Sequence, residues 1–214
     1  MANIASVAIN GTSLSSSITT DDYEFDAVTG TVKILKDSTL NIVCEGLGEL
    51  TLDLNGHIVT GALNGNQTKP VVYAYNGYTL TINDSNKTVE HKGYINSDSV
   101  WTLGTKQGQT EYNIFGGILT LPKVENNQKD VATIQGDDNS TINFLAGTVA
   151  GSQNEQGGTA GVTIGSNAKH YNTIVSLANR NGLLYVGEGA AIIGCRATTG
   201  AIKTWGTSNT IFDG

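Results

Sequence analysis

Residues 50–59 read LTLDLNGHIV, which is an alternating apolar strand, an Asn-Gly corner and the start of a second strand. Related phrases follow at residues 79–83 (TLTIN) and 113–119 (NIFGGIL). Alternation of apolar and polar residues indicates a half-buried strand, and Asn-Gly readily adopts the left-handed backbone of a tight corner. The recurrence of one phrase along a chain is typical of stacked structural repeats.

A further apolar strand precedes each phrase, and its copies define a period. Their central residues are spaced by 30, 28, 31, 31 and 40 residues, and they are Ile42, Val72, Val100, Val131, Val162 and Ile202. Such a period, with three strand signals in each unit, leaves no room for a helical crossover in every repeat. The sequence therefore predicts an all-β solenoid, with coils at about 40–61, 71–97, 100–122, 131–152, 161–196 and 201–214. A β-sandwich also uses short strands and turns, but it does not predict a sustained period.

The two ends of the solenoid are expected to differ. Residues 1–38 are predicted to form an N-terminal cap, with a hairpin at 23–35 and a Ser/Thr-rich loop at 12–20, while residues 39–214 form the solenoid itself. Residues 210–214 match the second strand of a coil whose third strand is missing. Because an open end exposes strand edges, we expect that either a longer polypeptide or another subunit covers it.

Charge and hydropathy exclude several partners. The chain has 12 Lys and Arg against 19 Asp and Glu, with a formal net charge of −7, so nucleic acid is not an expected partner. No apolar run approaches the roughly 20 residues of a membrane span. The first residues, MANIAS, lack the basic and apolar segments of a secretory signal. Two interpretations are open: the protein stays in the cell until something else releases it, or its signal was removed, and the first is favoured.

The residues that most often bind metals are far apart. Cys44 and Cys195 fall in the first and fifth predicted coils, about 19 Å apart at about 4.8 Å per strand, whereas a disulfide needs Cα atoms within about 6.8 Å. We therefore expect two free, core-facing thiols. His57, His91 and His170 form no close-spaced ligand motif, so neither a metal nor a cofactor is predicted.

An outward polar strip is expected along the second strand of successive coils. Its members are Asp53, Asn83, Asn113 and Asn143. Hydrolysis of a glycosidic bond ordinarily needs two carboxylates at a set separation, and this strip has only one. Asp84 and the Asp137-Asp138 pair fall at corners, where Asp commonly bonds backbone. No catalytic residue is assigned.

Aromatic residues form the more suggestive surface feature. Tyr73, Tyr75 and Tyr78 lie in or beside the first strand of one coil, and Trp101 occupies the comparable strand of the next. Rings on adjacent strands can stack on the apolar C–H faces of sugars, so these four are candidates for glycan contact. The alternative is that strand alternation turns some of the rings into the core.

Residues 52–58 (LDLNGHI) and 80–85 (LTINDS) resemble phrases common in right-handed parallel β-helix proteins of the pectin-lyase-like superfamily. The resemblance implies a right-handed parallel β-helix of about six coils, three strands per coil, with an N-terminal β cap. That superfamily includes polysaccharide lyases and hydrolases, bacterial surface adhesins, and bacteriophage tailspikes or fibres that are commonly trimeric. Its enzymes use clustered Asp residues, or calcium with a basic residue, and no such cluster is apparent in this sequence.

Together these observations predict a non-catalytic structural or glycan-contacting component of a surface assembly. The expected setting is a bacteriophage virion, as a spike, fibre or decoration protein, or else an extracellular surface. Expected partners are further copies of the chain, with a trimer favoured, other virion or surface proteins, and a cell-surface polysaccharide. Two alternatives remain open: a polysaccharide-degrading lyase or glycoside hydrolase with a site between coils or subunits, and a bacterial cell-surface adhesin.

Overall fold

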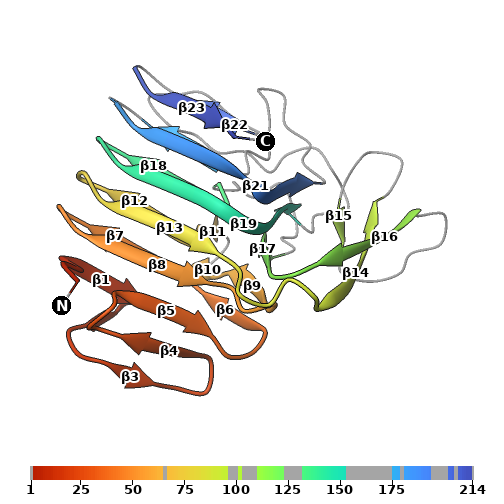
Figure 1. Ribbon diagram of the computed structural model, residues 1–214, viewed down its shortest axis with the longest axis horizontal. Helices are drawn as coiled ribbons and strands as arrows, with labels where there is room; N and C mark the ends of the chain where they lie inside the picture. Colours follow the sequence, from red (N-terminus) through yellow and green to blue (C-terminus); the bar gives the residue numbers. More distant parts are fainter. Residues whose placement is uncertain are drawn as a thin grey trace.

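The computed structural model describes residues 2–64, 67–95, 101–102, 110–122, 132–152, 175–178, 181–193, 202–204 and 207–213. Over these ranges the chain forms strands and turns and no helix. Two large sheets contain most of the strands, and they extend from the N-terminal end to β22 and β23 (Figure 1). The protein is all-β in the part of the chain that the structure describes.

The first large sheet, sheet A, has seven strands in the order β2-β1-β7-β12-β18-β20-β22. From β7 to β22 neighbouring strands are parallel, whereas β1 runs antiparallel to both β2 and β7. The bounds are β1 Ser6–Ile9, β2 Thr12–Leu14, β7 Ile42–Glu45, β12 Val72–Tyr75, β18 Ile134–Asp137, β20 Val175–Ala178 and β22 Ile202–Thr204.

The second large sheet, sheet B, contains eleven strands and curls on itself. Its main path is β3-β4-β5-β8-β13-β19-β17-β9-β6, while β21 pairs with β19 and β23. The curl occurs at β19, because its first half pairs with β13 and its second half pairs with β17. The bounds are β3 Ile18–Thr19, β4 Tyr23–Asp26, β5 Thr31–Ile34, β6 Ser38–Leu40, β8 Glu49–Asp53, β9 Ile58–Gly61, β13 Thr79–Asn83, β17 Ile118–Leu121, β19 Thr141–Ser152, β21 Leu183–Ile193 and β23 Asn209–Phe212.

Two small antiparallel sheets complete the described structure. One is β15-β14-β16, and the other is the pair β10-β11. Their bounds are β10 Leu63–Asn64, β11 Gln67–Thr68, β14 Glu90–Ile95, β15 Trp101–Thr102 and β16 Thr110–Phe115.

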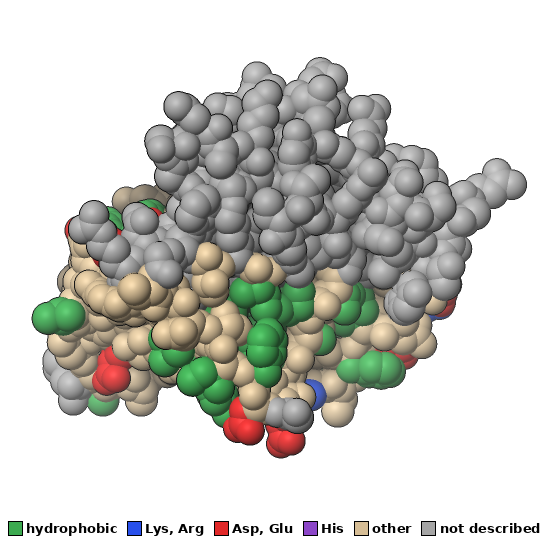
Figure 2. Space-filling model, turned by 90° about the horizontal axis from the view of Figure 1, so that it is seen from above, with side chains coloured by type: hydrophobic (Ala, Val, Ile, Leu, Met, Phe, Trp, Pro, Cys, Tyr) green, Lys and Arg blue, Asp and Glu red, His purple; other side chains and the backbone are tan. Residues whose placement is uncertain are grey.

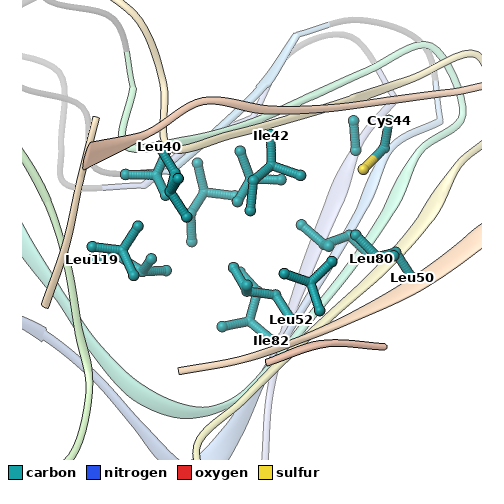
Figure 3. Packing of buried hydrophobic residues seen from close by; sticks show 14 of the residues in the cluster. Leu40, Ile42, Cys44, Leu50, Leu52, Leu80, Ile82 and Leu119 are labelled. Carbon is teal, nitrogen blue, oxygen red and sulfur yellow. The ribbon is translucent and has the colours of Figure 1, made fainter. Parts of the chain in front are cut away.

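One hydrophobic core receives side chains from both large sheets. Alternation along β8 and β13 turns Leu52 and Ile82 inward, and Ile42 and Cys44 of β7 meet them from sheet A (Figure 3). All four side chains are 0 % exposed. The predicted free, buried thiol is confirmed for Cys44, and burial raises the pKa of this thiol to about 12. Cys195 lies outside the described residues.

The corner after β8 has the predicted Asn-Gly geometry. Asn55 and Gly56 have φ angles of 48° and 77°, and the His57 backbone N–H donates to the Leu54 carbonyl at 2.9 Å. Left-handed backbone at two successive residues is what an Asn-Gly turn supplies at little steric cost. The chain can therefore turn sharply from β8 into β9.

A buried carboxylate, Asp84, links three segments at this corner. Its Oδ1 accepts hydrogen bonds from the backbone N–H groups of Gly56 at 2.8 Å and Asn86 at 3.4 Å. Its Oδ2 accepts one from the N–H of Gly117 at 2.7 Å. With 2 % of its surface exposed, Asp84 satisfies backbone donors that water does not reach. The prediction that Asp84 lies at a corner is correct, and its hydrogen bonds also reach the corners that contain Gly56 and Gly117.

The prediction of a right-handed parallel β-helix of about six coils is wrong. The sheets are mixed: β1 to β5 include antiparallel pairs, β14 to β16 form an antiparallel sheet, and sheet B curls at β19. The segment that contains β16 adds no strand between β13 and β19, because β13 pairs directly with β19. In sheet A the residue that pairs with Val72 on the next strand is Ile134. Three of the residues whose spacing defined the predicted period, Val100, Val131 and Val162, lie outside the described residues.

The N-terminal region has the expected hairpin but joins both sheets. The hairpin is formed by β4 and β5. Residues 12–20 were expected to be a loop and instead contain β2 and β3, because each finds a neighbouring strand to pair with. The strand β1 extends sheet A, and Phe25 and Val32 belong to the same core cluster as the later strands.

Candidate functional site

Two tyrosines stack on the outer face of sheet A. Tyr73 and Tyr75 are two residues apart on β12, so both side chains point away from the core, while Val72 and Ala74 point into it. The two rings have centroids 4.8 Å apart and an interplanar angle of 22°. Stacked rings in this arrangement form a partly exposed aromatic surface.

Acidic side chains from the neighbouring strands hold both rings. The Tyr75 hydroxyl donates to Glu45 Oε2 at 2.7 Å, from the residue opposite on β7. The Tyr73 hydroxyl donates to the Asp137 carboxylate at the end of β18. Asn76 Nδ2 also donates to Glu45, at 3.2 Å from Oε1. We call Glu45, Tyr73, Tyr75 and Asp137 the tyrosine surface.

Backbone and hydroxyl contacts fix the ends of the strands that carry the tyrosine surface. Asn76 and Gly77 follow β12 with φ angles of 59° and 87°, and the Gly77 N–H donates to the Asp138 carbonyl at 2.8 Å. Ser140, which is fully buried, donates from Oγ to the Ala74 carbonyl at 2.9 Å. The corners after β12 and β18 are thus tied together, which keeps Asp137 beside the rings.

The electrostatics keep the phenols neutral. The hydrogen bond to Glu45 raises the pKa of Tyr75, and burial raises it further. Burial is the main reason that the pKa of Tyr73 is raised, and the bond to Asp137 adds to it. Burial also raises the pKa of Asp137, the nearby charge of Asp138 acts in the same direction, and hydrogen bonds from Tyr73 and Gln135 oppose them. The surface therefore presents neutral rings beside acidic groups.

Two of the four aromatic candidates are not part of this surface. Tyr78 is 0 % exposed and its hydroxyl donates to the Ile4 carbonyl at 2.8 Å, so glycan contact by Tyr78 is excluded in this structure. The left-handed residues Asn76 and Gly77 separate it from β12, and it enters the core before β13 begins. Trp101 lies on β15 opposite Ile95 of β14, in a different sheet from Tyr73.

The expected polar strip is divided between sheets. Asp53 and Asn83 do lie side by side on β8 and β13. Asn143 is instead opposite Thr81, two residues before Asn83 on β13, and its Nδ2 is 3.4 Å from the Thr81 hydroxyl oxygen. Asn113 lies on β16 in the small sheet. Asp53 acts at the corner, where its Oδ1 accepts the N–H groups of residues 55 and 85 at 3.0 and 2.8 Å.

Sequence reasoning missed a cleft on the outer side of sheet B. It has a volume of about 560 Å³ and is lined by Leu145, Tyr185, Gly187, Glu188 and Asp213. The Tyr185 hydroxyl donates to the Asp213 carboxylate. Parallel pairing of β21 with β19 and β23 brings these residues together, and the only signal in the sequence is an outward tyrosine in the stretch LLYVGEG.

Metal-binding groups and membrane-spanning helices are both absent over the described ranges. There, no three His, Cys, Asp or Glu side chains are grouped so that they could hold a metal ion. Nor does this part of the chain contain a helix with the length and hydropathy needed to cross a bilayer.

The fold and the tyrosine surface define an all-β protein of curled, mixed sheets that carries aromatic and acidic groups on an outer face. No protein-family model, curated protein or solved structure matches the chain.

Proposed function

We propose that this protein is a non-catalytic, glycan-contacting component of a surface assembly, and that the tyrosine surface makes the contact. The observation that carries the proposal is the stacked Tyr73–Tyr75 pair, whose hydroxyls are both bound by carboxylates. Rings fixed at their hydroxyl ends lose little further freedom when a ligand binds, which favours affinity.

The chemistry of the surface suits a sugar. The C–H groups on one face of a sugar ring are apolar and pack on an aromatic ring. Sugar hydroxyls donate hydrogen bonds, and the carboxylate oxygens of Glu45 can accept them, with several lone-pair positions. The tyrosine surface thus combines an apolar platform with an acceptor at its border, which the neighbouring strand β7 supplies.

Binding to immobilised glycans, followed by titration calorimetry with those retained, tests the proposal. The double variant Tyr73→Ala/Tyr75→Ala is expected to lose at least about tenfold in affinity, which corresponds to about 1.4 kcal/mol. The matched control is Phe115→Ala, because Phe115 is also aromatic, is 59 % exposed and lies in another sheet. Equal affinity in the double variant and the control would refute a role for the tyrosine surface.

The non-catalytic part of the proposal has its own test. Incubation of the protein with each retained glycan should release no new reducing or unsaturated ends. The appearance of such ends would establish the alternative of a polysaccharide-degrading enzyme.

The bacteriophage virion setting and the trimer stay predictions. Light scattering on the intact chain measures the molar mass in solution. A trimer would support a spike or fibre component, whereas a monomer would favour a small adhesin.

A further inference from the structure

A β-bulge shapes the cleft beside Tyr185. Phe144 pairs with Val186, but the next paired residues are Ala146 and Gly189, so β21 advances three residues while β19 advances two. The extra residue places Gly187 and Glu188 opposite Leu145 and turns the strand locally. Bulges of this kind re-aim side chains and are frequent beside binding sites.

Glycines allow the bulged strand to lie close against β19. A Cβ on Gly189 would be 2.7 Å from the Leu145 carbonyl oxygen, and one on Gly187 would be 3.3 Å from Leu145 Cα. Side chains at these two positions would push β21 away from β19. With glycine there, the bulge forms part of the cleft, and Glu188 between them is exposed.

The lining of the cleft is both apolar and acidic. Tyr185 and Leu145 supply apolar surface, and Ile211, opposite Tyr185 on β23, is 48 % exposed beside them. Glu188 and Asp213 supply carboxylates, and Asp213 fixes the Tyr185 hydroxyl. Figure 2 looks onto the end of the molecule that carries β22 and β23, where hydrophobic side chains gather with acidic ones at their border.

We infer that this cleft is a second sugar-binding site, separate from the tyrosine surface and selective for neutral or amino sugars over acidic ones. Its volume lies in the range of pockets that hold small molecules, about 300–1,000 Å³. The ring of Tyr185 and the side chain of Leu145 pack on the C–H face of the sugar. The carboxylates of Glu188 and Asp213 accept hydrogen bonds from its hydroxyl or ammonium groups.

Charge determines the selectivity. Two carboxylates in the lining repel a uronic acid or a phosphorylated sugar, and they attract an amine. The ammonium group of Lys87 lies near Gly189, but Lys87 does not line the cleft, so both charged residues of the lining are acidic. The inference stands on the geometry of sheet B and does not depend on the tyrosine surface of sheet A.

Amide chemical-shift mapping on the intact, ¹⁵N-labelled chain tests the inference with three probes: cellotetraose, which is neutral, a chitosan tetramer, which is cationic, and tetragalacturonate, which is anionic. The first or the second is expected to shift the amides of Gly187, Glu188 and Gly189, with at least tenfold weaker binding of the third. Shifts confined to Tyr73 and Tyr75 would overturn this inference and leave the proposed function intact. No shift at residues 187–189 with any probe, or equal shifts with all three, would also overturn it.

Variants separate the two roles of the lining. Tyr185→Ala is expected to weaken cleft binding at least tenfold, whereas Tyr185→Phe retains the ring and should retain most of the affinity. Glu188→Gln/Asp213→Asn is expected to bring tetragalacturonate to within a few-fold of the neutral probe. Because these side chains lie on an outer face, circular dichroism should be that of the wild type. A folded Tyr185→Ala variant with unchanged binding would rule the cleft out.

Discussion

Replacing Asp84 with alanine is expected to destabilise the protein by about 3–6 kcal/mol. The carboxylate accepts two short hydrogen bonds from buried N–H groups, from Gly56 at 2.8 Å and Gly117 at 2.7 Å. A hydrogen bond to a charged group contributes about 1.5–3 kcal/mol, and the third, longer bond to Asn86 adds less. A domain of this size shifts in melting temperature by about 2–4 °C per kcal/mol, so the expected loss is about 6–24 °C.

Asp84→Asn separates the loss of charge from the loss of shape. The amide keeps one oxygen acceptor, but its nitrogen must face one of the two backbone donors, so at least one short bond is lost, at about 1.5–3 kcal/mol. The control is Asp21→Asn, which removes an exposed acid and should change stability by less than about 0.5 kcal/mol. Thermal and urea unfolding followed by circular dichroism provide the comparison. If both Asp84 variants unfold at the midpoint of Asp21→Asn, the argument from buried donors is refuted.

Three other predictions concern the core, the free thiol and an acidic group. Gly117→Ala should cost about 1–3 kcal/mol in urea unfolding, because its Cβ would lie 2.3 Å from Leu54 Cβ; wild-type stability would contradict this packing. In a Cys195→Ser background, Cys44 should react with a thiol reagent only on unfolding, since its raised pKa and its burial keep it protonated and inaccessible; rapid labelling of the native protein would contradict the prediction. The folded-state pKa of Asp137 lies above its ordinary value of 3.8, so the wild type should lose stability relative to Asp137→Asn as pH rises through that raised pKa. Below pH 3.8 the carboxyl is mostly protonated in both the folded and the unfolded state, so the difference between the two proteins should level off there. Melting temperatures of the two proteins from acidic to neutral pH check its sign.

Local structure could be predicted from the sequence where neighbouring residues determine it. Alternation identified the inward side chains of β8 and β13, and Asn55-Gly56 identified the corner after β8. The partners of each strand could not be predicted in this way. Residues 90–95 and 110–115 carry strand signals, yet they pair antiparallel with each other, and β13 pairs with β19 in their place. A period read from such signals counts strands that belong to another sheet.

The candidate site also has a part that local sequence predicts and a part that it does not. The spacing of Tyr73 and Tyr75 is enough to place both rings on one face of a strand. Their acidic partners are 64 and 30 residues away, from Tyr73 to Asp137 and from Tyr75 to Glu45, and only the register between strands selects them. Tyr78 was misassigned because the two left-handed residues before it change which way the chain faces.

The double pairing of β19 has a consequence for how the protein folds. The first half of β19 must pair with β13 before the curl of sheet B can continue into β17. These strands are distant in the sequence, since the paired residues Thr81 and Asn143 are 62 residues apart. The loop-closure entropy of such distant pairings is lost before their contacts form, which slows folding to about milliseconds to seconds or longer. The curl that joins the two halves of sheet B is therefore expected to be a late event in folding, and substitutions there should act mainly on the rate of unfolding.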